Sequence, residues 1–591
     1  MNAQEENHRL SLPELPLRLK ELRDQNARFL TITVLDAGDQ REVIYHFEKG
    51  ETLVNLRLRT SKGEQVPSIS DVYGSAFIAE NEVKENYGLN ISGISIDFGG
   101  KMLKAGDGSE VRLPDNQERP MALTKRFYGR CREKCPAMVN IPKYVRQIAE
   151  GDLRGAYDTV VEQAPFPAIL GRVCSAPCER GCRQDNNEEA IQNRLLKRYA
   201  ADSMGDFRRE VKRGSPTGKK VAIIGAGASG VTAAYYLGIK GHDVTIYDKA
   251  DMVGGTMQYI PRYRLPKDIL IAELMARIDE ADIRLELDTS VSNLQSLFDK
   301  GFDAVYAAIG TQKSLRLNIE GENFGVMDCL ELLASVNLYK NPPKLGNSVA
   351  IIGGGNSAVD AARTAKRLGA RNVTIFYKRT LKEMPALPQE IEGAIEEGIK
   401  FEFLVSPLKI VPDVPVKVIF QRMQLVGFDK SGRRMSVPIH GSNFTITADT
   451  IIKAVGQEPD IPQTFGVDLD SRGKFLVNKE TYESNIKGVW IGGSGAALGP
   501  NSVIDSIRDG RIVASAIDKY LGGKGLPDPY IDPDEFISKV APPEGDDRAP
   551  TVVRTLSPDK RITCFAEVEL GFNKEEATRE AKRCWRCDWN E

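Results

Sequence analysis

KKVAIIGAGASGVTAAYYLGIKGHDVTIYDKA, residues 219–250, is the stretch that sets the architecture of the middle of the chain. An apolar strand runs into Gly225-x-Gly227-x-x-Gly230, a helix follows, and a second strand ends at Asp248. The first glycine permits a tight turn, the second lets the backbone approach a pyrophosphate, and the third lets helix and strand pack closely. Free N–H groups at the start of the helix favour the pyrophosphate, and Asp248 can accept from a ribose hydroxyl. The stretch predicts a βαβ unit that binds a dinucleotide.

The same pattern returns in NSVAIIGGGNSAVDAARTAKRLGARNVTIFYKRT, residues 347–380. A buried strand again meets a glycine turn that opens a helix, which predicts a second dinucleotide site. The third small-residue position is Ala358, and the positions expected to contact the ligand at the turn are Gly353, Gly355, Asn356 and Ser357.

The second strand of this copy ends in cations. Lys378 and Arg379 stand where an acid would bind the ribose of NAD. Two cations suit the 2′-phosphate of NADP, so the pattern favours NADP(H) over NAD(H). The competing interpretation is that both side chains are solvated surface cations.

Two such fingerprints in one chain indicate a flavoprotein, with FAD in the first site and a nicotinamide in the second. Three kinds of segment support this interpretation. VGGTMQYIPRYRLP follows the first unit, and AAIGTQKS and KAVGQEPD look like crossings between the domains. GVWIGGSGAALGPNSVIDSIRDGRIVASAIDKYL looks like the closing strand and helix of the FAD domain. The region from about residue 121 to 525 resembles the small subunit of glutamate synthase and its relatives. These relatives include the large subunit of NADH-dependent ferredoxin:NADP oxidoreductase and the flavin half of dihydropyrimidine dehydrogenase. The resemblance implies that the FAD site also includes Gly255, Gly310, Gly493, Ser494 and Val503.

One position departs from this family. Members usually have an acid after the paired glycines near the end of the flavin region, where it touches the ribityl chain, and this chain has Ser494. A hydroxyl can hydrogen-bond there, so we expect FAD to bind. No Cys-x-x-Cys lies within the flavin region, which argues against a disulfide reductase, and the isolated Cys329 is expected to be a packing residue.

Cysteines cluster in one segment and in the tail. The segment from 131 to 182 holds Cys131, Cys135, Cys174, Cys178 and Cys182, and the tail holds Cys584 and Cys587. Thiolates clustered around a helix-sized insert are typical of iron–sulfur ligation, with zinc as the competing metal. The set exceeds the four ligands of one tetrahedral site, so the pattern favours iron–sulfur clusters over zinc.

The cysteine segment resembles the N-terminal iron–sulfur domain of the same family, which holds two [4Fe–4S] clusters. That pattern has a further Cys-x-x-Cys just upstream of Cys131, where this chain has MALTKRFYGR. The resemblance implies that Cys584 and Cys587 replace the missing pair. They would complete one cluster with Cys131 and Cys182. A surface thiol pair is the competing interpretation of the tail.

The remaining thiols would hold a second cluster, with ligands Cys135, Cys174 and Cys178. In some relatives a Glu or Gln is the fourth ligand, and the matching position here is Lys197, which cannot ligate while charged. The fourth ligand therefore stays open between water, Cys564 and another group, and the number of [4Fe–4S] clusters expected stays open between one and two.

The N-terminal segment YHFEKGETLVNLRLRTSKGEQVPSISDVYGSAFIAENEVKENYGLNISGI has alternating strands followed by a helix. Over about residues 28–100 it resembles the NuoC-type hydrophilic subunit of respiratory complex I and its counterpart in energy-converting hydrogenases. The parallels are Pro67-Ser68, Glu80-x-Glu82 and Tyr87-Gly88. The resemblance implies a scaffolding domain that docks beside a catalytic partner. An unrelated small α+β domain is the competing interpretation.

Composition indicates an ordinary globular protein. The 591 residues carry a formal net charge of −2, which argues against general binding to nucleic acids or membrane surfaces. The N-terminus lacks the basic-then-apolar order of a signal peptide, so we expect a cytoplasmic protein. The uncharged stretch 221–239 is almost long enough to span a bilayer, but its glycine spacing is better explained by the βαβ unit.

The sequence therefore predicts an α/β protein with two Rossmann-like domains, preceded by a small α+β domain and an α-helical iron–sulfur domain. The expected domains are a NuoC-like docking domain (20–105), an iron–sulfur domain (121–207), an FAD-binding domain (218–340 and 450–525), an NAD(P)H-binding domain (341–449) and a C-terminal strap with cluster ligands (526–591).

The function expected is an NAD(P)H-dependent FAD oxidoreductase that serves as the electron-transfer subunit of a redox complex. Hydride would pass between nicotinamide and FAD, and single electrons would pass through [4Fe–4S] clusters, with electron bifurcation as an option. The cofactors do this chemistry, so no side chain is assigned as acid or base. Expected partners are subunits of a hydrogenase, a formate dehydrogenase or a complex-I-like assembly, or a ferredoxin. The rivals are a glutamate synthase small subunit and a scaffold subunit without redox activity.

Overall fold

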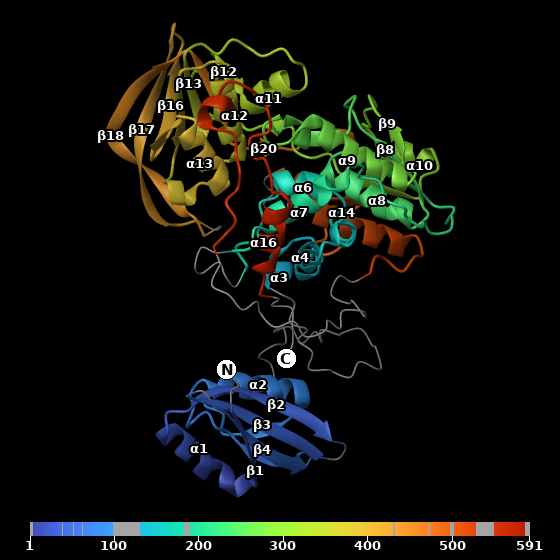
Figure 1. Cartoon of the computed structure of the whole chain (residues 1–591), viewed down its shortest axis with the longest axis vertical. Coiled ribbons are helices and arrows are strands. Elements are labelled where there is room, and N and C mark those ends of the chain that lie inside the picture. Colours follow the sequence, from blue (N-terminus) through green and yellow to red (C-terminus); the bar gives the residue numbers. More distant parts are fainter. Residues whose placement is uncertain are drawn as a thin grey trace. The chain divides into compact units, whose positions relative to one another are not determined.

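The computed structural model describes residues 4–37, 40–50, 52–61, 63–97, 130–182, 190–429, 432–470, 473–496, 502–527 and 549–585. Cys587 lies outside the described residues. The chain divides into two compact units, Met1–Thr124 and Lys125–Glu591, whose elements are labelled in Figure 1. Each unit is described by itself.

The first unit is a four-stranded sheet covered on one face by two helices. The order β1-β4-β3-β2 pairs β1 parallel to β4 and the other neighbours antiparallel. Tyr45 and Phe47 belong to the core shared by sheet and helices. The elements are β1 (Gln4–Leu10), α1 (Leu15–Asp24), β2 (Arg28–Ala37), β3 (Gln40–Lys49), β4 (Thr52–Ser61), β5 (Gln65–Pro67), α2 (Ala76–Tyr87) and β6 (Asn90–Ser92). The strands and the helix expected in this segment are therefore present.

A buried carboxylate fastens α2 to the loop after β5. Glu80 accepts from the Ser68 hydroxyl at 2.6 Å and from the Ile69 N–H at 2.6 Å. Burial raises the pKa of Glu80, and these donors oppose that shift. Ser68 and Glu80 belong to the sequence features on which the resemblance of the N-terminal segment rests. These features therefore stabilise the fold of the unit.

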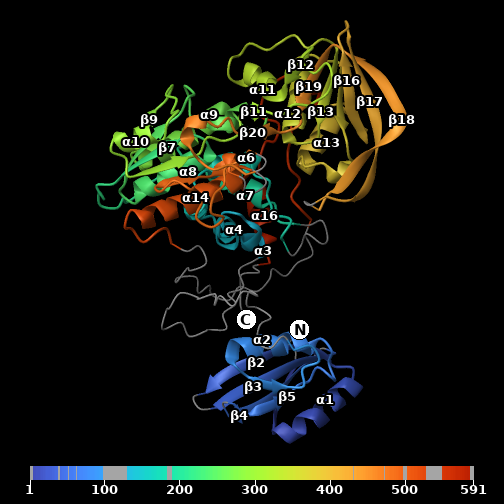
Figure 2. The same ribbon diagram turned by 180° about the vertical axis from the view of Figure 1, so that it is seen from behind.

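The second unit contains two parallel sheets, which Figure 2 shows from behind. The first sheet has the order β21-β10-β7-β8-β9. Helices α8 and α14 pack side by side on it. Its elements are β7 (Lys220–Ile224), α8 (Ala228–Ile239), β8 (Asp243–Tyr247), α9 (Lys267–Glu280), β9 (Arg284–Glu286), β10 (Ala304–Ala307), β21 (Val489–Ile491) and α14 (Val503–Tyr520).

The second parallel sheet has the order β12-β19-β13-β14-β15, with an antiparallel sheet β16-β17-β18 beside it. Its elements are β12 (Val326–Asp328), α11 (Cys329–Asn337), β13 (Ser348–Gly353), α12 (Asn356–Arg367), β14 (Asn372–Tyr377), α13 (Pro388–Glu396), β15 (Lys400–Phe403), β16 (Val405–Val411), β17 (Val416–Phe428), β18 (Arg434–Ala448) and β19 (Thr450–Ala454). Both β12 and β19 join this sheet although they lie outside the expected range 341–449.

Two short strands carry the chain between the parallel sheets. β11 (Lys313–Ser314) and β20 (Gln457–Glu458) pair antiparallel, so the chain leaves and returns side by side. They lie within AAIGTQKS and KAVGQEPD, the two segments expected from the sequence to be crossings between the domains. The second sheet is therefore an insertion between β10 and β21.

A helical layer and a C-terminal strap complete the second unit. The helices are α3 (Arg130–Lys134), α4 (Ile141–Glu150), α5 (Leu153–Val161), α6 (Pro167–Val173) and α7 (Asn193–Asp202). The strap, residues 549–585, includes α15 (Pro558–Arg561) and α16 (Lys574–Lys582), and α16 packs against α4 and α7 (Figure 1). Among the helices of the described segments, none has the length and apolarity needed to cross a bilayer.

Candidate functional site

The first cavity of the second unit opens at the carboxyl ends of β7, β8 and β10 and has a volume of about 340 Å³. Parallel strands place this edge where dinucleotides bind. Most of the positions expected from the sequence line it, namely Gly225, Gly227, Asp248, Gly255, Gly310, Gly493, Ser494 and Val503.

The glycines of the first turn differ in what surrounds them. Gly225 has φ +111°, and a Cβ there would collide with the carbonyl oxygen of Ala308. A Cβ on Gly230 would collide with the carbonyl oxygen of Gly225, so packing requires a glycine at this position. Gly230 does not line the cavity. Gly227 faces open space except for Gly255, which leaves room beside the start of α8. Such a cradle of backbone N–H groups fits a pyrophosphate.

Asp248 lies beside this turn, immediately after β8. Its carboxylate accepts from the N–H of Ala226 at 2.6 Å and from the N–H of Ala250 at 2.8 Å. A carboxylate offers about four acceptor positions, so two backbone donors leave capacity for a ribose hydroxyl.

Ser494 reaches the cavity from the opposite side. The hydroxyl of Thr311 donates to its Oγ at 3.5 Å, and both residues line the cavity. The first turn of α14 lines the same wall, and Ser502 caps that helix through the N–H of Asp505. The wall therefore combines hydroxyl groups with a helix N-terminus, which favours polar and anionic ligand groups.

The second cavity, of about 610 Å³, opens at the carboxyl ends of β13, β14 and β19. The expected positions Gly353, Gly355, Ser357, Lys378 and Arg379 line it. Asn356 does not, because its side chain accepts from the N–H of Leu387 at 2.9 Å and holds the segment before α13. Cys329 also lines the cavity, and burial raises the pKa of its thiol to about 12, so it stays protonated.

A cationic patch at one end of the second cavity consists of Lys378, Arg379 and Arg433. Arg379 pairs with Asp429 at 3.0 Å and donates to the carbonyl oxygen of Arg434 at 2.6 Å. Arg433 approaches the same Asp429 at 3.8 Å. Burial lowers the pKa of Lys378, and the two arginines lower it further. Three cations are thus gathered at one end of the cavity, and such a cluster of positive charge suits a phosphate.

Arg433 was missed by the sequence reasoning. It lies between β17 and β18, far along the chain from the glycine turn, and no local pattern links it to Lys378. Gln457 was missed as well. It belongs to β20 and lines both cavities, so the two cavities meet at this side chain.

The buried cysteine group consists of Cys135, Cys174 and Cys178. The N–H groups of Val139 and Ala137 donate to the sulfur of Cys135. Burial raises the pKa of Cys135 and of Cys178, and the neighbouring Cys174 raises both further by charge repulsion. Ligation of a metal would therefore have to displace their protons.

Two residues with a left-handed backbone conformation lie in the loops around this group. Met138 has φ 55° and Ala176 has φ 45°, which is uncommon for residues with a Cβ. The turn at Ala176 directs its own N–H to the sulfur of Cys174 at 3.4 Å. Backbone strain that aims N–H groups at sulfur fits thiolates bound to a cluster, since such hydrogen bonds stabilise the ligated form.

The peripheral cysteine group consists of Cys131, Cys182 and Cys584, which line one small pocket of about 30 Å³. The structure thus brings the tail to the two thiols named with it from the sequence, and the partner position Cys587 lies outside the described residues. Within the residues that are described, no three Cys, His, Asp or Glu side chains converge on a single metal ion. Cys564 lies elsewhere on the strap, where its thiol donates to the carbonyl oxygen of Lys560.

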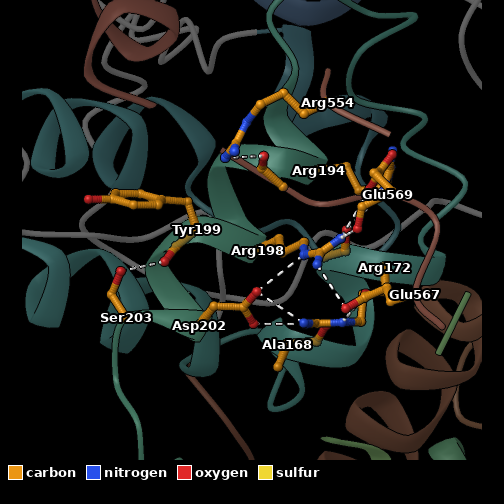
Figure 3. Close-up of polar contacts among 12 residues, drawn as sticks. Ala168, Arg172, Arg194, Arg198, Tyr199, Asp202, Ser203, Arg554, Glu567 and Glu569 are labelled. Atoms are coloured by element: carbon orange, nitrogen blue, oxygen red, sulfur yellow. Dashed lines mark hydrogen bonds and ion pairs between the residues drawn. The ribbon is translucent and has the colours of Figure 1, made fainter. Parts of the chain in front are cut away.

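An ionic cluster fastens the strap to the helical layer (Figure 3). Arg194 pairs with Glu569 through two contacts of 2.7 Å, and Arg172 pairs with Glu567 at 2.8 Å. Arg198 contacts both glutamates. Burial would raise the pKa of Glu569, but Arg194 and Arg198 hold it below its usual range. The strap that carries Cys584 is therefore anchored by paired charges.

Family models match three segments of the chain. Residues 219–510 match the pyridine nucleotide-disulphide oxidoreductases, and residues 123–208 match domain II of dihydropyrimidine dehydrogenase with its 4Fe–4S cluster. Residues 10–95 match the 30-kDa subunit of the respiratory-chain NADH dehydrogenase. The two cavities and both cysteine groups lie largely within the first two segments.

Several curated proteins are similar over most of the chain. The NADP(+)-dependent formate dehydrogenase subunit beta of Moorella thermoacetica is 34% identical over 504 residues, which cover 77% of this chain and 70% of the relative. The NADPH-Fe(3+) oxidoreductase subunit beta of Geobacter sulfurreducens is 33% identical over 531 residues, with 81% and 77% covered. The glutamate synthase [NADPH] small chain of Azospirillum brasilense is 32% identical over 423 residues, with 67% and 86% covered.

The cavities, the cysteine groups and these matches agree. The FAD and NAD(P)H fold, the 4Fe–4S domain and the NuoC-like domain expected from the sequence are confirmed. The chain belongs to the family that unites these beta subunits with glutamate synthase small chains, and it is an NAD(P)H-dependent FAD oxidoreductase with an iron–sulfur domain for electron transfer.

Proposed function

We propose that the chain is the NADP(H)-linked electron-transfer subunit of a multi-subunit redox complex. The observation that carries the proposal is the junction at Gln457, where the two dinucleotide cavities meet within the unit that also holds both cysteine groups. When bound, the cofactors supply hydride transfer between nicotinamide and flavin and single-electron transfer through the cluster. The protein supplies position, exclusion of water and electrostatics.

In the first cavity the chain holds the FAD pyrophosphate at the start of α8, beside Gly225 and Gly227. Asp248 is assigned to the adenosine ribose, because its carboxylate lies next to the turn and retains acceptor capacity. Ser494 and Thr311 provide hydroxyl groups for the ribityl chain from the other wall. Together these residues would hold FAD in the cavity that meets the second cavity at Gln457.

In the second cavity the cationic patch favours NADP(H). Lys378, Arg379 and Arg433 gather positive charge at one end of the cavity, where a 2′-phosphate would form charge-assisted hydrogen bonds. The names of the relatives from Moorella, Geobacter and Azospirillum contain NADP(+) or NADPH, which supports the same choice.

Two [4Fe–4S] clusters are assigned to the two cysteine groups. Cys131, Cys182 and Cys584, with Cys587, are the proposed ligands of the peripheral cluster. The buried group is proposed to hold the other. Grouped thiols with N–H groups aimed at sulfur fit this chemistry.

The first unit is proposed to dock the chain on a catalytic partner of the hydrogenase, formate dehydrogenase or complex-I class. Support comes from the match of residues 10–95 to a complex I subunit and from a relative named as a formate dehydrogenase beta subunit. Native purification with identification of bound proteins tests this. A glutamine-using partner would instead assign the chain to glutamate synthase.

The redox proposal is tested by anaerobic titration of the purified protein with NADPH and, separately, with NADH. We expect NADPH to bleach the flavin absorbance and to produce the electron paramagnetic resonance (EPR) signals of reduced iron–sulfur clusters, and NADH to act far less efficiently. A protein without flavin colour, or one whose flavin neither nucleotide bleaches, would show that the chain is a scaffold subunit.

A further inference from the structure

A buried pair of hydroxyl groups lies at the wall of the first cavity. The Oγ of Ser229, in the first turn of α8, is 2.6 Å from the Oη of Tyr306, in β10. Ser229 is only 5% exposed and Tyr306 is fully buried, and Ser229 also lines the cavity. Two hydroxyl groups at this distance share one hydrogen, so one of them donates and the other accepts.

The direction of this hydrogen bond follows from the surroundings of Tyr306. Among the described residues, Ser229 is the only hydrogen-bond partner of the Tyr306 hydroxyl. Burial raises the pKa of Tyr306, so the hydroxyl keeps its proton. A buried O–H group that did not donate would be left unsatisfied, which costs free energy. Tyr306 therefore donates the shared hydrogen, and Ser229 accepts it.

The hydroxyl hydrogen of Ser229 is then left for another acceptor. Within the described part of the chain, the only hydrogen bond of this hydroxyl is the one with Tyr306. Thr232, three residues further along α8, shows the contrast, because its hydroxyl donates to the carbonyl oxygen of Ala228 at 2.6 Å. Ser229 borders the cavity and Thr232 does not. The acceptor for the Ser229 hydrogen therefore has to come from a ligand in the cavity.

Close packing fixes the place of the hydroxyl pair. A Cβ on Gly492 would lie 2.5 Å from the hydroxyl oxygen of Tyr306. A Cβ on Gly493 would lie 3.1 Å from the Cβ of Ser229. On the other side, a Cβ on Gly510 of α14 would collide with the carbonyl oxygen of Ser229. Ser229 is thus held between two backbone segments, and its hydroxyl is preorganised for a ligand.

We propose that Ser229 is a direct ligand of the FAD pyrophosphate and that Tyr306 is the positioning residue that orients its hydroxyl. The proposal rests on the proposed function, which places the pyrophosphate at the start of α8. The N–H groups there suit an anion, and an O–H group without an acceptor in the described protein adds a charge-assisted hydrogen bond from a side chain. The glycine fingerprint prescribes no residue type at position 229, so this contact is a property of this chain.

The test uses the full-length protein purified with its flavin. Flavin fluorescence after dilution measures Kd for FAD, and phosphorus-31 NMR reports the environment of the bound pyrophosphate. We expect Ser229→Ala to raise Kd for FAD by about tenfold or more and to shift the pyrophosphate resonances. Thr232→Val removes a buried hydroxyl from the same helix and should leave both measurements unchanged.

A double variant separates a ligand role from a packing role. Ser229→Ala alone leaves the Tyr306 hydroxyl buried without its acceptor, which lowers the melting temperature. Ser229→Ala/Tyr306→Phe removes both hydroxyl groups, so this penalty disappears while the ligand group is still absent. We expect the double variant to regain a melting temperature close to that of wild type and to keep the raised Kd. Recovery of the wild-type Kd in the double variant would overturn the proposal.

Tyr306→Phe tests the orienting role. It keeps the Ser229 hydroxyl but removes the group that directs its hydrogen. We expect Kd for FAD to rise by about two- to fivefold, and this effect should disappear in the Ser229→Ala background because the two residues act as a pair. An equal effect of Tyr306→Phe in both backgrounds would refute orientation by Tyr306.

The remaining outcomes are also distinguishable. Weaker FAD binding by Ser229→Ala with unchanged phosphorus resonances would overturn the proposal, because the hydroxyl would then contact another part of FAD. A wild-type protein that purifies without flavin would refute the proposed use of the first cavity. If wild type carries flavin and Ser229→Ala keeps the wild-type Kd, the proposed function stands and only the role of Ser229 is refuted.

Discussion

Glu273 of α9 connects the flavin domain to a cysteine loop through one buried carboxylate. It accepts from the N–H groups of Ala168 and Ile169 at 2.7 and 2.8 Å, at the start of α6. Cys174 of the buried cysteine group directly follows the end of that helix. Burial raises the pKa of Glu273 to about 7, even though the two N–H donors favour the charged form.

Because of this raised pKa, the free energy of unfolding depends on pH in a direction that can be predicted. Between the ordinary value of 4.5 and about 7, the folded state binds a proton that the unfolded chain has released. The unfolding free energy therefore falls as pH rises through this window, by about 3 kcal/mol for a shift of this size. Glu273→Gln removes this titration. The melting temperature of the variant minus that of wild type should therefore increase from about pH 5 to about pH 7.5.

Differential scanning fluorimetry across this pH range measures the effect. Asp268→Asn, an exposed acid on the same helix, is the control and should follow the wild type. A Glu273→Gln protein whose melting temperature stays parallel to that of wild type at every pH would show that the carboxylate titrates normally.

Arg433 is the single residue best suited to test coenzyme choice. Arg433→Gln removes one of the three cations of the patch, and a charge-assisted hydrogen bond contributes about 2 kcal/mol. We expect Kd for NADPH to rise by roughly tenfold, with little change for NADH. Arg434→Gln is the matched control, because its side chain donates to the carbonyl oxygen of Leu425 and does not line the cavity. Equal weakening of both nucleotides would argue against a 2′-phosphate site.

At the scale of elements, the strap depends on its ionic cluster. Glu569→Gln leaves Arg194 with a neutral partner in a mostly buried site, at a cost of roughly 2 kcal/mol. We expect faster proteolysis within residues 549–585 and faster loss of iron to a chelator, because Cys584 lies at the end of this segment. Glu575→Gln, an exposed acid of α16, should behave as wild type. Unchanged proteolysis and iron retention would mean that other contacts alone fasten the strap.

A second ionic contact fixes the two dinucleotide domains against each other. Arg264, which follows the flavin cavity in the chain, pairs with Asp360 of α12 through two contacts of 2.8 Å and with Glu390 of α13 at 2.8 Å. The ring of Tyr263 lies 3.9 Å from the guanidinium carbon of Arg367. All these contacts join the loop after the flavin cavity to the helices behind the nicotinamide cavity.

Asp360→Asn tests whether this contact sets the reacting distance. Small misplacement of reacting groups is costly for rate and much less so for binding. We expect flavin reduction by saturating NADPH to slow by about tenfold in stopped-flow measurements, with Kd nearly unchanged. Glu392→Gln, an exposed acid on α13, is the control. A weaker Kd with an unchanged limiting rate would show that Asp360 affects only nucleotide binding.

At the scale of the whole molecule, the first unit should be separable from flavin chemistry. It has its own core, and neither cavity is lined by any described residue of that unit. A shortened chain, residues 125–591, should keep NADPH-dependent flavin bleaching within about twofold of the full chain. Proteins that purify with the full chain should no longer purify with the shortened chain. Loss of bleaching would show that the first unit supports the cofactor domains directly.

The sequence was most informative where the chemistry is local. The turns at Gly225 and Gly353 could be predicted because strand, turn and helix are consecutive in the sequence. At each of these glycines, a Cβ would collide with backbone atoms of the same unit. Spacing together with the family resemblance also grouped Cys584 with Cys131 and Cys182. These thiols do line one pocket.

Features that arise from pairing between distant segments were not predicted. β12 has three residues and joins its sheet only through β19, so no periodicity could assign it. Arg433, from the connection between β17 and β18, and Gln457, from β20, reach the second cavity from segments far along the chain from its glycine turn.

The position of Cys584 in the peripheral pocket also determines the order in which the two cysteine groups can form during protein synthesis. This thiol is translated about 400 residues after Cys182, which at a ribosomal speed of about 5–20 residues per second is a delay of roughly 20 to 80 s. The nascent chain can assemble the pocket of Cys135, Cys174 and Cys178 during that interval. The peripheral pocket must wait for α16 and Cys584, so metal delivery to its proposed cluster would follow translation of the strap.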